Sequence, residues 1–307
     1  MPSFDHLQVR RLDMIGFRAG RESQRTIWHG TGVNEQSEVD RIGQYYISFH
    51  ENAARPLDRD ALGIPILKDG RRMGTQYDPM VVAQWGLRNH DLFKGTGSPE
   101  NRQNFMRASD WICDYLNRDQ LCWHPGSGQG ISLLVRAHAQ TGEQRYREAA
   151  DRAFAVFLVS NGGGDRPASG DSDENVAING SVDSMSTRCL SEFIWSAWGI
   201  YDYFLANREN AARDLFARAV NTVASNVKAF DVGFWSRYER TDTWVPNVAS
   251  YFYHELHINQ MRVMFQMTGT EVLARAAERW RQYTESRLNR VRALTYRFAW
   301  QISLGQL

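Results

Sequence analysis

The feature that most constrains the fold of this chain is a repeated helical segment. TGEQRYREAADR, residues 141–152, and TGTEVLARAAER, residues 268–279, both begin with Thr-Gly and end with Ala-Ala, an acidic residue and Arg. NAARDLFARA, residues 210–219, is a weaker third copy. Because glycine commonly ends one helix and small residues let the next helix pack back closely, each copy predicts a helical hairpin.

Hairpins that repeat along a chain pack on their neighbours. The sequence therefore predicts a mainly α fold, an incomplete α/α toroid of helical hairpins, over residues 100–307. Apolar residues recur at helical spacing in the segments 101–117, 130–140, 144–159, 187–205, 208–230, 255–267 and 271–300.

Residues 1–99 lack this repeat and are expected to form an N-terminal arm with a small extended or β-containing segment. A short strand is expected at residues 43–49, and a loop or hairpin at residues 63–74 with Asp69-Gly70 as its tight turn. Residues 80–87 can form a short helix after Pro79. The turn-rich stretch FKGTGSP, residues 93–99, is the candidate boundary between the two parts.

Composition narrows the class of protein. The 307 residues are 42% hydrophobic and 12% aromatic, which is enough for a sizeable core. The net charge of +1 gives no general attraction for nucleic acid or for a membrane surface. The three cysteines lack CxxC spacing and predict reduced thiols. No apolar run spans a bilayer and no signal-peptide core is present, which fits a cytoplasmic protein or a chain that begins after a removed leader.

The densest cluster of chemically active side chains is PNVASYFYHELHINQ, residues 246–260. Pro246 disfavours a helix immediately before it, whereas helical spacing begins within the cluster. The cluster is therefore expected at a loop-to-helix junction, where Tyr and His can be held rigidly with their tips accessible. A helix start with buried aromatic side chains fits the same spacing.

The preceding stretch DVGFWSRYE, residues 231–239, predicts a loop or short hairpin that ends in Tyr238. Arg237 beside it is a cationic neighbour, which favours a tyrosinate. Two tyrosines on opposite faces of one carbon would suit removal and return of a proton there. Trp235 and Trp244, in loop-like sequence, are the aromatic residues best suited to stack on sugar rings.

Two further motifs are weaker. GSGQG, residues 126–130, lacks the strand and the remaining residues of a phosphate-binding loop. Its glycines would instead let the backbone approach a sugar that Gln129 hydrogen-bonds. His254 and His257 stand three residues apart and could share a metal on a helix, but no third ligand is identifiable. We therefore expect no metal and no cofactor.

Residues 246–260 resemble the signature of the D-glucuronyl C5-epimerase family, Pro-Asn-(aliphatic)-Ala-Arg-Trp-Asp-Tyr-His-Thr-Thr-His-Ile-Asn-Gln. The matching residues are Asn247, Ala249, Tyr253, His254, His257, Ile258, Asn259 and Gln260. Segments 76–87, 108–112, 125–138, 195–204 and 231–239 resemble other family segments in the same order.

The resemblance implies an isomerase that inverts C5 of D-glucuronic acid residues to L-iduronic acid in a glycosaminoglycan-like polysaccharide. The family's acid and base tyrosines fall on Tyr238 and Tyr253. Because the C5 proton lies α to a carboxylate, its removal requires donors or cations that neutralise the carboxylate. The candidate substrate-binding residues are Tyr77, Gln84, Gln129, Glu192, Arg237, Asn247 and His254. Residues 100–307 would be the catalytic domain, with residues 1–99 contributing to the cleft.

The chain also departs from the family. The Glu-Glu-Tyr-Pro segment with a third catalytic tyrosine corresponds to residues 178–192, which contain no Tyr. Glu192 or Glu174 could replace part of it. The β-sandwich that animal members insert is missing, and Thr241 and Ser250 stand where the family usually has Arg. The exact substrate is therefore left open.

Two alternatives to the epimerase follow. A uronate lyase begins with the same proton abstraction and then expels the C4 oxygen, and a non-catalytic glycan-binding protein would not need the third tyrosine. In each case the expected partner is an anionic uronate polysaccharide. The Arg-rich C-terminal helix, residues 275–297, fits either a solvated face or a homodimer contact. The apolar contacts of the homodimer would be Leu288, Val291, Leu294, Tyr296 and Phe298.

Overall fold

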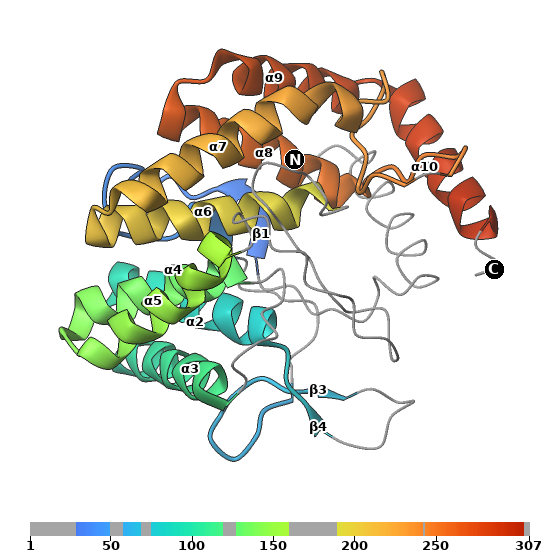
Figure 1. Cartoon of the computed structure of the whole chain (residues 1–307). Helices are drawn as coiled ribbons and strands as arrows, with labels where there is room; N and C mark the ends of the chain where they lie inside the picture. Colours follow the sequence, from blue (N-terminus) through green and yellow to red (C-terminus); the bar gives the residue numbers. More distant parts are fainter. Residues whose placement is uncertain are drawn as a thin grey trace.

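The computed structural model describes residues 29–49, 58–68, 75–118, 127–159, 189–241 and 243–303 (Figure 1). The two short antiparallel strand pairs are β1 (His29–Val33) with β2 (Ile47–Phe49), and β3 (Leu67–Lys68) with β4 (Thr75–Gln76). The helices are α2 (Pro79–Thr96), α3 (Pro99–Arg118), α4 (Ser127–Thr141), α5 (Gln144–Val159), α6 (Leu190–Asn207), α7 (Asn210–Asn226), η2 (Val227–Phe230), α8 (Tyr251–Thr268), α9 (Glu271–Glu285) and α10 (Arg287–Ser303).

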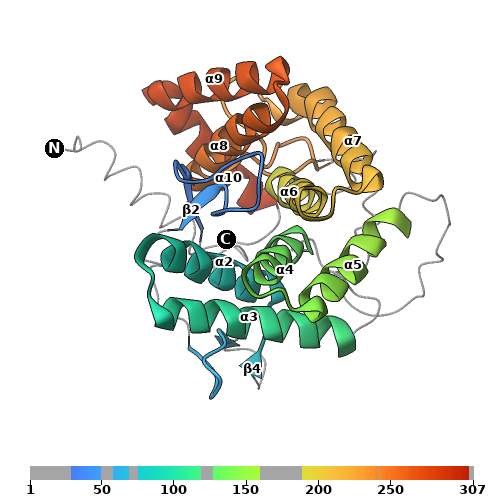
Figure 2. The same ribbon diagram turned by 90° about the vertical axis from the view of Figure 1, so that its left-hand side faces the viewer.

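The helices form two layers of an open ring, as Figure 2 shows. α2, α4, α6 and α8 make the inner layer and pack on one another in that order. α3, α5, α7 and α9 make the outer layer, and each packs on the inner helix that precedes it in the chain. β1 packs against α8. This arrangement confirms the predicted mainly α fold, an incomplete toroid of helical hairpins with a small N-terminal β segment.

In the described part of the chain, each turn from an inner to an outer helix reverses in the same way. One residue adopts the left-handed backbone conformation and donates its N–H to the carbonyl four residues earlier, at 2.7 or 2.8 Å. These residues are Gly97, Gly142, Arg208 and Gly269. The Thr-Gly repeat seen in the sequence is therefore the chemistry of this turn.

The same turn explains where the predicted boundaries differ. Residues 93–99 are the end of α2 and its turn into α3, so the helix after Pro79 is longer than expected. The division of domains near residue 99 stays a prediction. The single helix expected over residues 271–300 is wrong, because Ser286 is extended (φ −80°, ψ 118°) and separates α9 from α10. The predicted N-terminal arm before residue 29, the turn at residues 69–70 and Glu174 lie outside the described residues.

Glycines also set how closely the inner helices approach. A Cβ atom on Gly128 in α4 would lie 2.0 Å from the carbonyl oxygen of Trp195 in α6, and one on Gly199 would lie 2.3 Å from Gly128. Only hydrogen side chains fit between backbones this close. The described part of GSGQG, residues 127–130, thus opens α4, and its Gly128 serves helix packing.

A buried ion pair ties the ring to the segment before β2. The Arg136 guanidinium on α4 contacts the Asp202 carboxylate on α6 at 2.7 Å, and both side chains are fully buried. Tyr46 donates its hydroxyl to the same carboxylate at 2.6 Å, and Arg136 donates to the Gly43 carbonyl at 2.8 Å. Such a pair is stable in an apolar interior only when its other hydrogen-bonding atoms are also partnered, as they are here.

The C-terminal helix α10 presents apolar side chains to solvent. Leu288, Val291 and Phe298 are 67%, 59% and 57% exposed. Tyr296 differs from the expectation, because its ring packs against Phe234 at 5.1 Å. The homodimer through this helix stays a prediction. Among the described helices, none has the length and apolarity needed to cross a bilayer.

Two glycines with open space around them test the turn geometry. Gly142 has φ +74°, whereas Gly95 lies within α2, and a Cβ at either position would meet no atom within 4 Å. We expect Gly142→Ala to lower the free energy of unfolding by about 1 kcal/mol, because an L-residue is strained there. Gly95→Ala should raise it by roughly 0.5 kcal/mol, because Ala favours a helix. Urea denaturation measures both, and equal effects would refute the turn analysis.

Candidate functional site

The sequence predicts a loop or short hairpin at residues 231–239. Its end, residues 236–238, pairs with residues 247–249, and residues 236–249 are the hairpin referred to below. The Tyr238 N–H donates to the Asn247 carbonyl at 2.8 Å, and the Ala249 N–H donates to the Ser236 carbonyl at 2.9 Å. The start of α6 packs on the same hairpin, because the Leu190 N–H donates to the Tyr238 carbonyl at 3.3 Å. Residues distant in the sequence therefore meet at the beginning of two inner helices.

Helix α8 begins earlier than its apolar spacing indicates. Ser250 has extended backbone, and its hydroxyl accepts from the Tyr253 N–H at 3.2 Å. A serine hydroxyl in this position satisfies a donor that the first helical turn leaves unpaired. The residues from Tyr251 to His254 therefore lie in the first turn of α8, at the loop-to-helix junction that the sequence predicts.

The hairpin and α8 bring Tyr238 and Tyr253 into contact. Their ring centroids lie 4.8 Å apart with an angle of 70° between the ring planes. This is an edge-to-face contact of the kind that aromatic rings favour. Both side chains are only partly buried. Two phenol groups, separated by 14 residues in the sequence, are thus neighbours in the fold.

His254 follows Tyr253 in the first turn of α8 and is fully buried. Its ring stacks on Trp235 at 3.8 Å. The Ser236 N–H points at Nδ1 at 3.1 Å, so the proton resides on Nε2 and is donated to the Trp280 carbonyl at 3.0 Å. Burial lowers the pKa of His254 to about 3. Both ring nitrogens are therefore occupied inside the protein.

His257 completes a buried cluster around Ser236. The Ser236 hydroxyl lies 2.7 Å from Nδ1 of His254 and 3.0 Å from Nδ1 of His257. Burial, together with the nearby His254, lowers the pKa of His257 to about 3. Ser236 was not singled out by sequence reasoning, since a lone serine in a loop carries no pattern. In the part of the chain that the structure describes, no group of three His, Cys, Asp or Glu side chains could hold a metal ion.

Three of the remaining candidate residues lie near the tyrosine pair. Asn247 is buried and donates its side-chain amide to the Glu239 carboxylate at 2.9 Å. Arg237 precedes Tyr238 in the hairpin, and its buried Nε has no hydrogen-bond partner. Glu192 is in the first turn of α6 and is partly buried.

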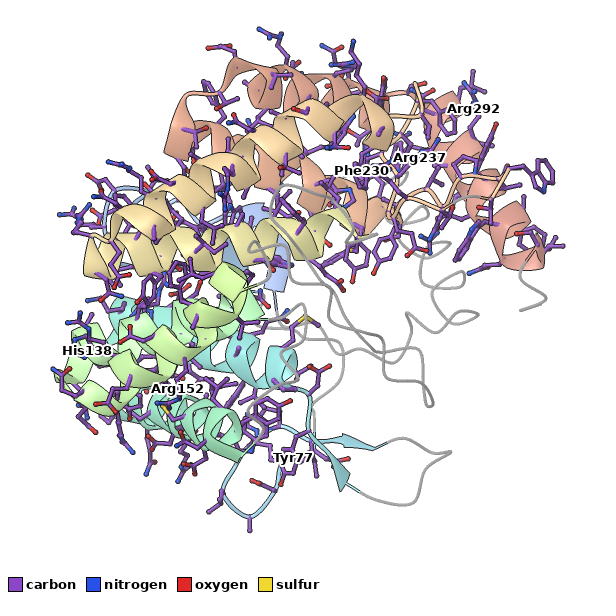
Figure 3. All side chains as sticks on the ribbon, viewed as in Figure 1. Tyr77, His138, Arg152, Phe230, Arg237 and Arg292 are labelled. Carbon is purple, nitrogen blue, oxygen red and sulfur yellow. The ribbon has the colours of Figure 1, made fainter. Side chains whose placement is uncertain are left out.

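The other three candidates come from α2, from α4 and from the residues just before α2. Gln84 and Gln129 are almost completely buried between α2 and α4, where Gln84 donates its side-chain amide to Gln129 at 3.0 Å. Tyr77 donates its hydroxyl to Asp60 at 2.8 Å. Figure 3 shows Tyr77 near the β3–β4 end of the molecule, well separated from Arg237.

Cys189 is a site residue that sequence reasoning missed. It immediately precedes α6, and its backbone pairs with that of Glu239 in an isolated antiparallel β-bridge. Burial, and to a smaller extent the charge of Glu192, raise the pKa of the Cys189 thiol to about 12. Hydrogen bonds from Ser191, the Glu192 backbone and Tyr238 act in the opposite direction and lower it, but they are outweighed. Cys189 is therefore a neutral thiol beside Tyr238. It falls in the segment where the family's third tyrosine is missing.

Comparison with known proteins identifies the family of this chain. The family model described as the D-glucuronyl C5-epimerase C-terminus matches residues 116–282, which is more than half of the chain and includes both tyrosines. The chain therefore belongs to the D-glucuronyl C5-epimerase family. A D-glucuronyl C5-epimerase from Caenorhabditis elegans is 26% identical over 179 residues, which are 52% of this chain and 29% of that relative. The chain thus matches less than a third of the length of this relative.

The buried histidines predict a loss of stability in acid. In the unfolded chain His254 and His257 bind protons below their ordinary pKa of 6.5. In the folded chain both imidazoles stay neutral until the pH falls to about 3. Stability should therefore fall as the pH drops below 6.5, by about 1.4 kcal/mol per pH unit for each histidine. We expect urea denaturation at pH 7 and pH 5 to show this loss.

His257→Asn provides the matched control for that measurement. Asn retains a hydrogen-bonding group toward Ser236 but does not titrate. The stability lost between pH 7 and pH 5 should therefore be smaller than in the wild type by about 2 kcal/mol. An identical loss in both proteins would contradict the buried neutral imidazole.

Proposed function

We propose that this chain is the catalytic part of a polysaccharide uronate C5-epimerase. Its substrate would be D-glucuronic acid residues in a glycosaminoglycan-like polymer such as heparosan, and its product L-iduronic acid residues. The observation that supports this most directly is the contact between Tyr238 and Tyr253 in a chain of the D-glucuronyl C5-epimerase family. Phenol groups can act as acid and base on one carbon only when both reach it.

In the proposed reaction, one tyrosine acts as a phenolate and removes the C5 proton. The electron pair of the broken C–H bond moves into the adjacent carboxylate. The other tyrosine then donates its phenolic proton to the opposite face of C5, and a new C–H bond forms with inverted configuration. The step requires no oxidant or reductant. Each phenol must lie about 3 Å from the carbon in the bound complex.

Recognition of the substrate carboxylate is assigned in this proposal to the hairpin and the first turn of α6. The free Nε of Arg237 supports a role for this guanidinium in binding an anion. Asn247 and Glu192 would contact sugar hydroxyls. Full burial supports a positioning role for His254 in place of direct sugar contact. The proposal assigns no contact to Gln84 and Gln129, which hydrogen-bond each other between α2 and α4, or to Tyr77, which lies at the β3–β4 end of the molecule.

The experiment is incubation of the protein with heparosan in deuterated water. An epimerase incorporates deuterium at C5, seen by NMR, and leaves the chain length unchanged. Cleavage with absorbance from an unsaturated uronate would instead identify a lyase. Binding without exchange would identify a non-catalytic glycan-binding protein and contradict the proposal.

Tyrosine variants test the assigned roles. Tyr238→Phe and Tyr253→Phe should each lower the rate of epimerisation by at least about 100-fold, because each removes an acid or base from the reaction. Tyr296→Phe is the control, since Tyr296 packs in the same aromatic cluster. It should retain the wild-type rate. Full activity in either of the first two variants would remove that tyrosine from the mechanism.

A further inference from the structure

Trp244 is almost completely exposed beside the candidate site. Its side chain is 91% accessible, whereas Trp85, Trp198, Trp235 and Trp280 are at most 1% accessible. Tryptophan is highly buried on average because its large ring gains most from leaving water. An indole left in solvent is therefore a feature that packing of the described residues does not explain.

The place of Trp244 in the chain puts it near the tyrosine pair. The two arms of the hairpin join where the Tyr238 N–H donates to the Asn247 carbonyl at 2.8 Å. Trp244 is three residues before Asn247, so their Cα atoms lie at most about 11 Å apart. The indole therefore lies at the tip of the hairpin that carries Tyr238.

The described residues of this tip, Thr241 and 243–245, make local hydrogen bonds. The Thr241 and Thr243 hydroxyls lie 2.7 Å apart, and the Thr243 hydroxyl donates to the Val245 carbonyl at 2.8 Å. Val245 is 5% exposed and anchors the returning arm. Arg240 is tied to Asn226 at 3.2 Å. The tip thus keeps the indole exposed while its neighbouring residues are bonded to the protein.

This combination of groups matches the chemistry of a sugar residue in an acidic polymer. A pyranose ring has apolar C–H faces, which pack on a flat aromatic ring, and hydroxyl groups at its edges. The indole offers an apolar face and an N–H donor, and threonine hydroxyls lie next to it in the chain. Arg240, four residues before Trp244 in the chain, contributes positive charge to this part of the hairpin.

We propose that Trp244 is the platform of an outer subsite that stacks on one sugar of the uronate polymer while a nearby uronate lies at Tyr238 and Tyr253. This inference rests on the proposed function for the identity of the polymer. It assigns to Trp244 a binding role that is separate from proton transfer.

Binding, measured apart from turnover, tests the subsite. Calorimetric titration with heparosan gives the affinity of the wild type and of Trp244→Ala. We expect the Kd of Trp244→Ala to rise about tenfold, because the variant loses the aromatic face on which the sugar stacks, and Trp244→Phe to remain within about threefold of the wild type. Phe298→Ala is the control, because Phe298 is a 57% exposed aromatic residue on α10. It should bind as the wild type does.

The outcomes separate this inference from the proposed function. Wild-type affinity in Trp244→Ala, together with normal C5 exchange in the wild type, overturns the subsite alone. Weaker binding in Trp244→Ala with no C5 exchange in the wild type supports the subsite and overturns the epimerase. A change in sedimenting mass of Trp244→Ala at unchanged polymer affinity would show a protein contact instead, and would overturn the subsite. A wild type that binds no heparosan would overturn both.

Discussion

The geometry of the candidate site depends on the contact between Ser236 and the buried face of α8. Ser236 meets His254 through both its N–H and its hydroxyl, and the same hydroxyl reaches His257. Tyr238 follows Ser236 by two residues, and Tyr253 immediately precedes His254. The contact that fixes the hairpin on the helix therefore also sets where the two phenol rings meet. Both imidazoles are fully buried, and burial lowers the pKa of each to about 3, so both are neutral at pH 7. They can therefore hold this position without taking part in proton transfer.

The ring of helices supplies the fixed frame for that contact. α6 and α8 are neighbouring inner helices, and both begin beside the hairpin (Figure 1). The close approach of α4 to α6 at Gly128 and Gly199, and the ion pair between Arg136 and Asp202, hold the inner layer together. A site on rigid helix ends is more precise than one built only from loops. The proposed two-base reaction would need that precision, because in it two side chains address one carbon.

Much of the fold could be predicted from local pattern. Apolar spacing located the helices, and the Thr-Gly repeat located two of the reversals between layers. The same rule was missed at Gly97, where the turn-rich stretch was interpreted as a boundary, and at Arg208, because no glycine marks its left-handed backbone. The break at Ser286 also lacks a glycine or proline, so periodicity alone extended one helix through it.

The site was less predictable than the fold. The resemblance selected Tyr238 and Tyr253, but only the folded hairpin shows that their rings touch. His254 shows why the role of a site residue is hard to predict from sequence: a polar residue in a motif can either bind a ligand or hold the site together. Burial and the partners of both ring nitrogens, which depend on Ser236 and Trp280 elsewhere in the chain, favour the second role.

The central claim is that the two phenols address opposite faces of one carbon. Its most direct test is deuterium exchange at C5 without inversion, followed separately from D-glucuronate and from L-iduronate polymers, in variants that lack one phenol each. With a single base left, exchange should survive from one epimer in Tyr238→Phe and from the other epimer in Tyr253→Phe. The same epimer preference in both variants would contradict the claim.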